Sequence, residues 1–139
     1  MILNIVMTVA TPIVMEVLGW LMHRYLFHGP LWVLHKDHHL PSSGFLEKND
    51  LFSSFFAGVS MVLIISSAAT QAYGLLFSIG LGMAIYGFFY FWIHDGLAHK
   101  RWKPPSFLRP KWAELVKKNH RFHHQKVTKD GQGPYGLFF

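Results

Sequence analysis

Long apolar runs, separated by short polar segments, dominate the pattern of this chain. Three runs are long enough to cross a bilayer, which takes about 20 apolar residues; they cover residues 2–22, 51–72 and 73–93. The second and third runs meet at residues 71–74, which indicate a tight turn between antiparallel helices. The pattern predicts an all-α integral membrane bundle of about three transmembrane helices, formed by a single domain of residues 1–139. The first run has no Lys or Arg before it, so we expect a retained span rather than a signal peptide.

Charged side chains are few and unevenly placed. They make up 14 % of the 139 residues, whereas a typical soluble domain has about 25 %. Residues 51–93 carry none, which argues against a soluble buried helix pair and against a nucleic-acid-binding protein. All 13 lysines and arginines lie within residues 24–48 and 100–129. Three spans put both blocks on one side of the membrane, which the positive-inside rule identifies as cytoplasmic.

The ten histidines form four boxes with a doubled spacing. H-x4-H followed by H-x2-H-H occurs in residues 23–39 and again in residues 94–124. Positions i, i+3 and i+4 of a helix share a face, so each H-x2-H-H box is expected to aim three imidazoles in one direction. Each pair of boxes follows the end of a predicted span, which brings all four to the cytoplasmic membrane surface. The ten are His23, His28, His35, His38, His39, His94, His99, His120, His123 and His124.

The H-x4-H boxes pose a geometric problem. Residues five apart lie about 140° from one another around an ideal α-helix. His23 and His28, like His94 and His99, can face one metal ion only if the helix ends or bends between them; otherwise they bind different ions. A Gly-Pro pair directly after the first box ends a helix, and a glycine inside the second could loosen the turn.

So many imidazoles in a short chain indicate a metal site rather than pH-sensitive surface histidines. Ten neutral nitrogens exceed the needs of one ion, whereas two six-coordinate ions offer about twelve positions. Structural zinc is normally four-coordinate and would leave ligands spare. Imidazole suits Fe, Cu, Ni and Zn, so the ligand set predicts two transition ions and leans to iron. The chain has no cysteine and no dinucleotide-binding fingerprint, so electrons are expected from an external donor.

Segments around the boxes resemble the membrane fatty-acid hydroxylase and desaturase superfamily and, within it, the bacterial β-carotene hydroxylases. They are HRY at 23–25, HGPLW at 28–32, EKNDLF at 47–52 and HDGL at 94–97. The resemblance implies a di-iron centre ligated by all ten histidines, dioxygen as oxidant and a ferredoxin-type donor.

The activity that this resemblance implies is hydroxylation of C3 of carotenoid β-ionone rings, from β-carotene to β-cryptoxanthin and zeaxanthin, in the bacterial inner membrane. Two alternatives lie within the superfamily: a carotenoid 4-ketolase, or another lipid or sterol hydroxylase or desaturase. A third, of another class, is a non-catalytic membrane metal-binding protein.

Polar residues near the boxes are candidates to orient the ligands, because a ligating imidazole usually donates its second N–H to a carboxylate or carbonyl. Glu16 is the clearest, since it lies seven residues before His23 inside an apolar span, where a charge is costly. We expect it to bond a ligand histidine or a neighbouring helix. For the others the alternative is a solvated carboxylate. The full set is Glu16, Asp37, Glu47, Asn49, Asp50 and Asp95.

Two further segments adjoin the boxes. The aromatic run before His94 is a candidate substrate pocket and equally a candidate lipid-facing belt; it consists of Phe88, Phe89, Tyr90, Phe91 and Trp92. Residues 111–124 are predicted to form an amphipathic helix with apolar anchors and histidines on one stripe. Its basic residues are available for the headgroups of membrane lipids and for docking an acidic ferredoxin.

Overall fold

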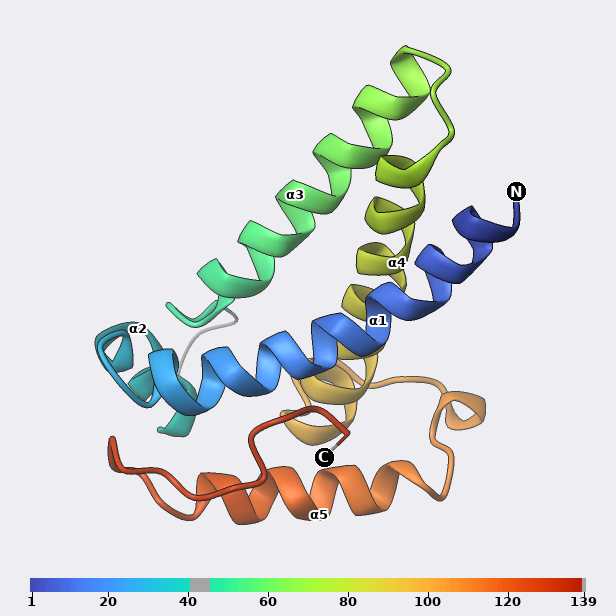
Figure 1. The fold of residues 1–139 in the computed structure, drawn as a ribbon. Helices are drawn as coiled ribbons and strands as arrows, with labels where there is room; N and C mark the ends of the chain where they lie inside the picture. Colours follow the sequence, from blue (N-terminus) through green and yellow to red (C-terminus); the bar gives the residue numbers. More distant parts are fainter. Residues whose placement is uncertain (41–45, 139) are drawn as a thin grey trace.

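Three long helices form the body of the protein. The computed structural model describes residues 1–40 and 46–138, and every regular element in these residues is helical. The long helices are α1 (Ile2–Met22), α3 (Asp50–Ala69) and α4 (Leu75–Phe89). All three are long and apolar enough to cross a membrane, α1 and α4 together with the π-helices that prolong them to Phe27 and Ala98. Helices α1 and α3 both pack along α4 (Figure 1). The prediction of an all-α membrane bundle is confirmed.

The histidine-bearing elements gather at one end of this bundle. Helices α2 and α5 lie at the opposite end from the N-terminus and the α3–α4 turn (Figure 1). Helices α1 and α4 each continue into a π-helix on reaching this end. The shorter elements are the π-helices His23–Phe27 and Tyr90–Ala98, the α-helices α2 (Trp32–His35) and α5 (Ala113–His124), and the 3₁₀ turns Lys36–His39 and Ser106–Leu108.

The spans differ from their predicted bounds mainly at this end. The first and third reach Phe27 and Ala98 because their π-helices prolong the apolar helices. The second ends at Ala69, since the turn already begins at Thr70 and Gln71 takes a positive φ of 53°.

Many large apolar side chains of α1 and α3 are exposed, among them Ile13 at 64 % and Val62 at 66 %. Such surfaces suit lipid rather than water.

Glycines of α4 allow the other two long helices to approach it closely, as small residues do between membrane helices. A Cβ on Gly82 would lie 2.6 Å from Thr11 Cβ of α1, and one on Gly80 would lie 2.9 Å from Leu63 Cβ of α3. Ser60 of α3 also donates a 2.8 Å hydrogen bond to the Gly80 carbonyl oxygen. Helix α4 is therefore the central helix, and its small residues set its distance from α1 and α3.

Replacing Gly82 with alanine is expected to lower the free energy of unfolding by about 1–3 kcal/mol, because the new methyl group overlaps α1. Unfolding in mixed detergent micelles with increasing SDS measures the change. Gly58→Ala in α3 is the matched control, since nothing lies within 4 Å of its added Cβ and it reports the helix-propensity gain alone. Equal stability of the two variants would contradict the close α1–α4 packing.

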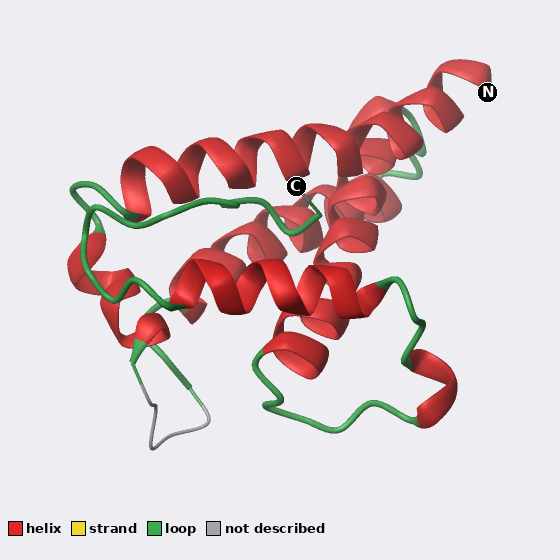
Figure 2. Cartoon of the chain, turned by 90° about the horizontal axis from the view of Figure 1, so that it is seen from below, coloured by secondary structure: helices red, strands yellow, loops and turns green. Residues whose placement is uncertain are grey.

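Helix α5 confirms the predicted amphipathic helix, with Val116 and His123 buried and the basic Lys118 and Arg121 exposed. It begins at Ala113, slightly later than expected, because Lys111 and Trp112 form a turn before it. After α5 the chain reverses and runs back between α1 and α5, a path visible in two views (Figures 1 and 2). This return places the C-terminal residues beside the histidines.

Candidate metal centre

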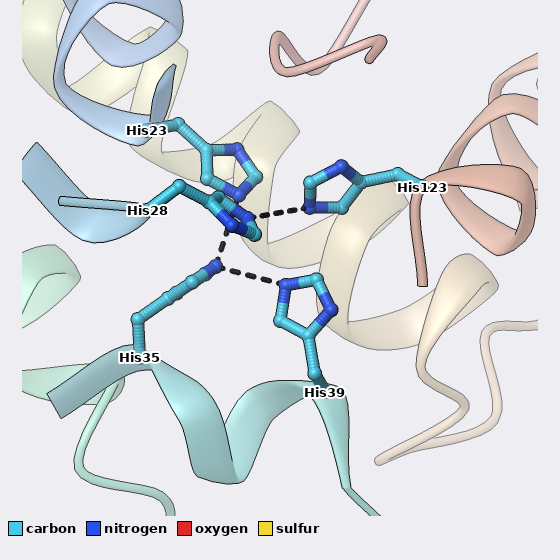
Figure 3. A group of neighbouring side chains, drawn as sticks. All are labelled: His23, His28, His35, His39 and His123. Atoms are coloured by element: carbon cyan, nitrogen blue, oxygen red, sulfur yellow. Dashed lines mark hydrogen bonds between the residues drawn. The ribbon is translucent and has the colours of Figure 1, made fainter. Parts of the chain in front are cut away.

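Nine of the ten histidines form two adjacent groups, in each of which the potential ligand nitrogens lie within 4.8 Å of one another. His124 belongs to neither group by this measure, but its ring centroid lies 4.3 Å from those of both His39 and His120. The five-histidine cluster consists of His23, His28, His35, His39 and His123 (Figure 3). The four-histidine cluster consists of His38, His94, His99 and His120.

The two H-x2-H-H boxes do not each aim three imidazoles at one point, which corrects the expectation from helical spacing. In the first box, His35 and His39 join the five-histidine cluster, whereas His38 joins the other. In the second box, His123 and His120 divide in the same way. The two clusters adjoin, so rings leaving one helical face fan out to both. The planes of His38 and His39 accordingly lie 83° apart.

The H-x4-H boxes, in contrast, each supply one cluster, and the π-helices explain how. The His28 N–H bonds to the His23 carbonyl at 3.0 Å, and the His99 N–H to the His94 carbonyl at 2.8 Å. These i to i+5 bonds define a widened π turn, which brings residues five apart onto one side of the helix. The five-residue spacing that conflicts with an α-helix is the spacing that a π turn requires.

Three expected supporting residues accept hydrogen bonds from Nδ1–H groups. Asn49 Oδ1 accepts from His35 at 2.6 Å and Glu47 Oε2 from His38 at 2.8 Å. Asp95 Oδ1 accepts from His94 at 2.7 Å. Each bond leaves the Nε2 lone pair of its imidazole pointing into the cluster.

The other three expected residues accept hydrogen bonds from groups other than the histidines. Asp37 accepts from the Lys48 N–H at 2.8 Å, and Asp50 accepts from the Glu47 N–H at 2.9 Å. Glu16 accepts a 2.8 Å bond from the hydroxyl of Tyr86 in α4, so it bonds a neighbouring helix, one of the two arrangements expected for it.

The close contacts between ring nitrogens are what a metal ion would relieve. His23 Nε2 and His35 Nε2 lie 3.0 Å apart, and His38 Nε2 and His94 Nε2 lie 3.1 Å apart. All four rings already donate Nδ1–H elsewhere, so in the neutral form lone pairs face each other. Neighbouring nitrogens bound to one ion by bonds of about 2.1 Å lie roughly 3 Å apart. His124 Nε2 is also buried without a hydrogen-bond partner among the described residues. These donors fit metal ions.

Burial keeps the imidazoles neutral and their lone pairs available. It lowers the pKa of His35 to about 3 and the pKa of His123 to about 4. Burial, with neighbouring imidazoles adding to its effect, also lowers the pKa of His38 well below its ordinary value of 6.5. At neutral pH these groups carry no proton that a metal ion would first have to displace.

Two kinds of supporting group escape the sequence argument. Arg101 contacts Glu47 Oε2 and Asp50 Oδ1, both at 2.7 Å, and so joins the segment at the start of α3 to the end of the π-helix that prolongs α4. The backbone carbonyls of Lys129, Gln132 and Tyr135 accept from Nδ1 of three cluster histidines. An arginine near a histidine box is a weak signal, and a backbone carbonyl carries no sequence signal, because every residue has one.

An apolar cavity of about 460 Å³ adjoins both clusters. Its lining includes His23 and His35 of one cluster and His38, His94 and His120 of the other. The remaining walls come from α1 and the π-helix that prolongs it, from α3 and α4, and from the C-terminal segment. Their side chains include Met15, Phe27, Phe52, Phe56, Met83 and Leu137. The cavity lies within the size range of ligand pockets, about 300–1,000 Å³.

The aromatic run before His94 contributes only part of this cavity. Tyr90 and Phe91 line it, whereas the lining does not include Phe88, Phe89 or Trp92. Five consecutive residues of a helix point all around its axis, so they cannot all face one side. Phe88 is 57 % exposed, as expected of the alternative, a lipid-facing position. Gly87 of α4 also lines the cavity.

Comparison with known proteins gives a consistent result. The family model described as fatty acid hydroxylase matches residues 8–139. The β-carotene hydroxylase of Pseudescherichia vulneris is 37 % identical over all of this chain and 78 % of its own length. That of a Paracoccus strain is 38 % identical over 98 % of this chain and 83 % of its own. A chloroplastic β-carotene 3-hydroxylase of Arabidopsis thaliana is 34 % identical over 95 % of this chain and 43 % of its own. No solved structure matches significantly.

Proposed function

The chain belongs to the fatty acid hydroxylase family, and from this we propose that it hydroxylates C3 of the β-ionone rings of carotenoids. β-Carotene becomes β-cryptoxanthin and then zeaxanthin. The names of its relatives support the substrate class. The observation that carries the proposal is the apolar cavity between the long helices, whose lining includes histidines of both clusters.

Two iron ions are the proposed cofactors. The five-histidine cluster holds one, and the four-histidine cluster, with His124 beside it, holds the other, so that all ten histidines act as ligands. Bound iron supplies the activation of dioxygen that an unactivated ring C–H bond requires, which side-chain acids and bases cannot provide. One oxygen atom enters the C–H bond and the other leaves as water, with two electrons and two protons consumed.

The residues around the cavity bind the ring, orient it and exclude water. Phe27 and Phe52 stack with their ring centroids 3.8 Å apart and form part of its wall. Tyr90 lies where the cavity meets the four-histidine cluster, with its hydroxyl 3.3 Å from His94 Nε2. A carotenoid is a long apolar rod, so it enters this cavity from the hydrocarbon core of the bilayer.

Filling the cavity should slow hydroxylation without disturbing the metal. Gly87 lines the cavity, and nothing lies within 4 Å of a Cβ added there. Gly87→Leu is therefore expected to lower hydroxylation at least about 10-fold, the loss of roughly 1.4 kcal/mol of binding or orientation. Pigment yield measures hydroxylation, and the iron content of the same preparation measures metal binding. Gly58→Ala, outside the cavity lining, is the control. Full activity of Gly87→Leu would contradict the assignment of this cavity to the substrate.

Electrons come from an external, ferredoxin-type donor that docks on the basic face at the histidine-bearing end. Lys111, Lys118 and Arg121 are exposed there, whereas Lys117 pairs with Glu114 at 2.8 Å. The positive-inside rule supports a cytoplasmic location for this end, with the spans in the bacterial inner membrane. Charge reversal at Lys118 and Arg121 tests the docking face, because electron delivery should fall most at low salt.

Pigment analysis of a β-carotene-accumulating bacterial host that expresses the chain tests the proposed function. We expect β-cryptoxanthin and zeaxanthin, which the same host without the chain does not form. Ketocarotenoids oxidised at C4 would instead identify a ketolase. Unchanged β-carotene, with iron-loaded protein in the membrane, would contradict carotenoid hydroxylation and favour another lipid substrate or a non-catalytic metal-binding protein.

A further inference from the structure

The C-terminal strap, residues 129–138, lies against the five-histidine cluster. It runs between α1 and α5 (Figures 1 and 2). Three of its carbonyl oxygens, spaced three residues apart, accept hydrogen bonds from cluster histidines. Lys129 O accepts from His28 Nδ1 at 3.2 Å, Gln132 O from His123 Nδ1 at 2.5 Å and Tyr135 O from His23 Nδ1 at 2.6 Å.

We propose that this strap positions the ligands of one metal ion only, the ion held by the five-histidine cluster. The inference rests on the proposed function insofar as that cluster holds iron. Each carbonyl holds its imidazole as the Nδ1–H tautomer and fixes the plane of the ring, so the Nε2 lone pair points at the ion. Three of the five ligands of this cluster are oriented in this way.

The four-histidine cluster is oriented by other groups. His38 and His94 donate to the carboxylates of Glu47 and Asp95, which Arg101 approaches at 2.7 and 3.9 Å. None of these residues belongs to the strap. A disturbance of the strap should therefore weaken metal binding at one cluster and spare the other, a selectivity that general unfolding of the end of the bundle would not produce.

Gly131 brings the strap into contact with a ligand ring. Its φ is +57°, a conformation that glycine adopts at little cost, and a Cβ there would lie 2.6 Å from His28 Nδ1. Any other residue would push the strap and the imidazole apart. Two residues on, a Cβ on Gly133 would lie 3.6 Å from the Tyr135 ring, an ordinary contact.

Glu16 anchors the far end of the strap to the membrane helices. Its Oε1 accepts the Phe138 N–H at 2.7 Å, while its Oε2 accepts the Tyr86 hydroxyl at 2.8 Å. The side chain lies within an apolar span and the residue is only 4 % exposed. A carboxylate in such a place is costly unless it is bonded. Glu16 is thus a positioning residue, which acts on the cluster through the strap.

The test compares metal binding by Gly131→Ala and Gly133→Ala in full-length protein purified in detergent. Co²⁺ titration with absorption spectroscopy and metal analysis gives the affinity and number of bound ions. Gly131→Ala should bind one ion with wild-type affinity and the other about 10–100-fold more weakly, the usual effect of losing a ligand's partner. Gly133→Ala should bind both as the wild type does. Wild-type binding by Gly131→Ala, or equal weakening of both ions, would overturn the proposal.

The anchor provides a second test, which also serves if Gly131→Ala does not fold. Glu16→Gln keeps a carbonyl oxygen that can accept the Phe138 N–H, whereas Glu16→Ala keeps no acceptor. The same selective loss of one ion is expected in Glu16→Ala, with partial or full rescue in Glu16→Gln. If Glu16→Ala binds both ions normally, the anchoring role is wrong.

These measurements use no substrate, so they separate this inference from the proposed function. A wild-type protein that binds two ions but does not hydroxylate carotenoids contradicts the function, and its strap variants still decide the inference. A chain that hydroxylates β-carotene, but whose Gly131→Ala and Glu16→Ala variants bind both ions normally, contradicts the inference alone.

Discussion

Replacing His38 with alanine is expected to abolish the formation of β-cryptoxanthin and zeaxanthin and to release the metal ion of the four-histidine cluster. His38 contacts both another histidine of this cluster and the carboxylate that orients it. Its Nε2 is 3.1 Å from His94 Nε2, and its Nδ1–H donates to Glu47 at 2.8 Å. Alanine therefore removes a ligand and leaves the buried Glu47 carboxylate without this donor, which costs a further ~1–3 kcal/mol.

Pigment analysis and metal content of the purified protein measure the two effects of this substitution. Lys36→Ala, at an exposed position of the same 3₁₀ turn, is the matched control and should keep both activity and metal. The five-histidine cluster should retain its ion in His38→Ala. Zeaxanthin formed at the wild-type rate by His38→Ala would contradict the assignment of this cluster as a catalytic metal site.

Arg101→Met is expected to lower the free energy of unfolding by about 3–5 kcal/mol, the usual result of removing one partner from a buried ion pair. The guanidinium contacts Glu47 and Asp50 at 2.7 Å, with Asp95 at 3.9 Å. Its side chain is only 13 % exposed. Without it, three carboxylates face one another in a poorly solvated place. Because Glu47 and Asp95 orient His38 and His94, metal affinity at the four-histidine cluster should also fall about 10–100-fold.

Arg101→Lys separates the charge from the geometry of this network. An ammonium group keeps the charge but lacks the planar fork that reaches two carboxylates at once, so an intermediate loss is expected. Arg121→Met, on the exposed face of α5, is the control for loss of a positive charge. Unfolding in SDS and Co²⁺ titration are the measurements. Stability of Arg101→Met equal to that of Arg121→Met would show that the network contributes little.

The fold was predictable because its signals are local. An uncharged run such as residues 51–93 is long enough to span a bilayer twice, and nothing distant in the chain is needed to recognise it. The same holds for α5, whose periodic apolar positions mark one face. The ends of the elements were less predictable, since the turn at Thr70 and the π-helical extensions to Phe27 and Ala98 depend on bonds and packing that form only in the folded chain.

The spacing of the histidine boxes predicted only part of the arrangement of the imidazole rings. H-x4-H raised a conflict with α-helical geometry, and the π turns at His23 and His94 resolve it. H-x2-H-H suggested a common target, but His35 and His38 belong to different clusters. Spacing gives the angular direction in which side chains leave one helix, whereas the target of each ring depends on which other helices lie opposite.

The amino-acid sequence by itself determined the three membrane helices, the number and kind of potential metal ligands and the end of the bundle at which they gather. These follow from hydrophobic length, charge placement and residue type, all of which are properties of short segments. Only the tertiary structure decided how the histidines divide between two clusters, which of the candidate polar residues orient them, and which further groups do so. Arg101 and the carbonyls of the strap meet their partners across long stretches of chain, and a backbone carbonyl is the same at every residue, so its role arises only from where folding places it.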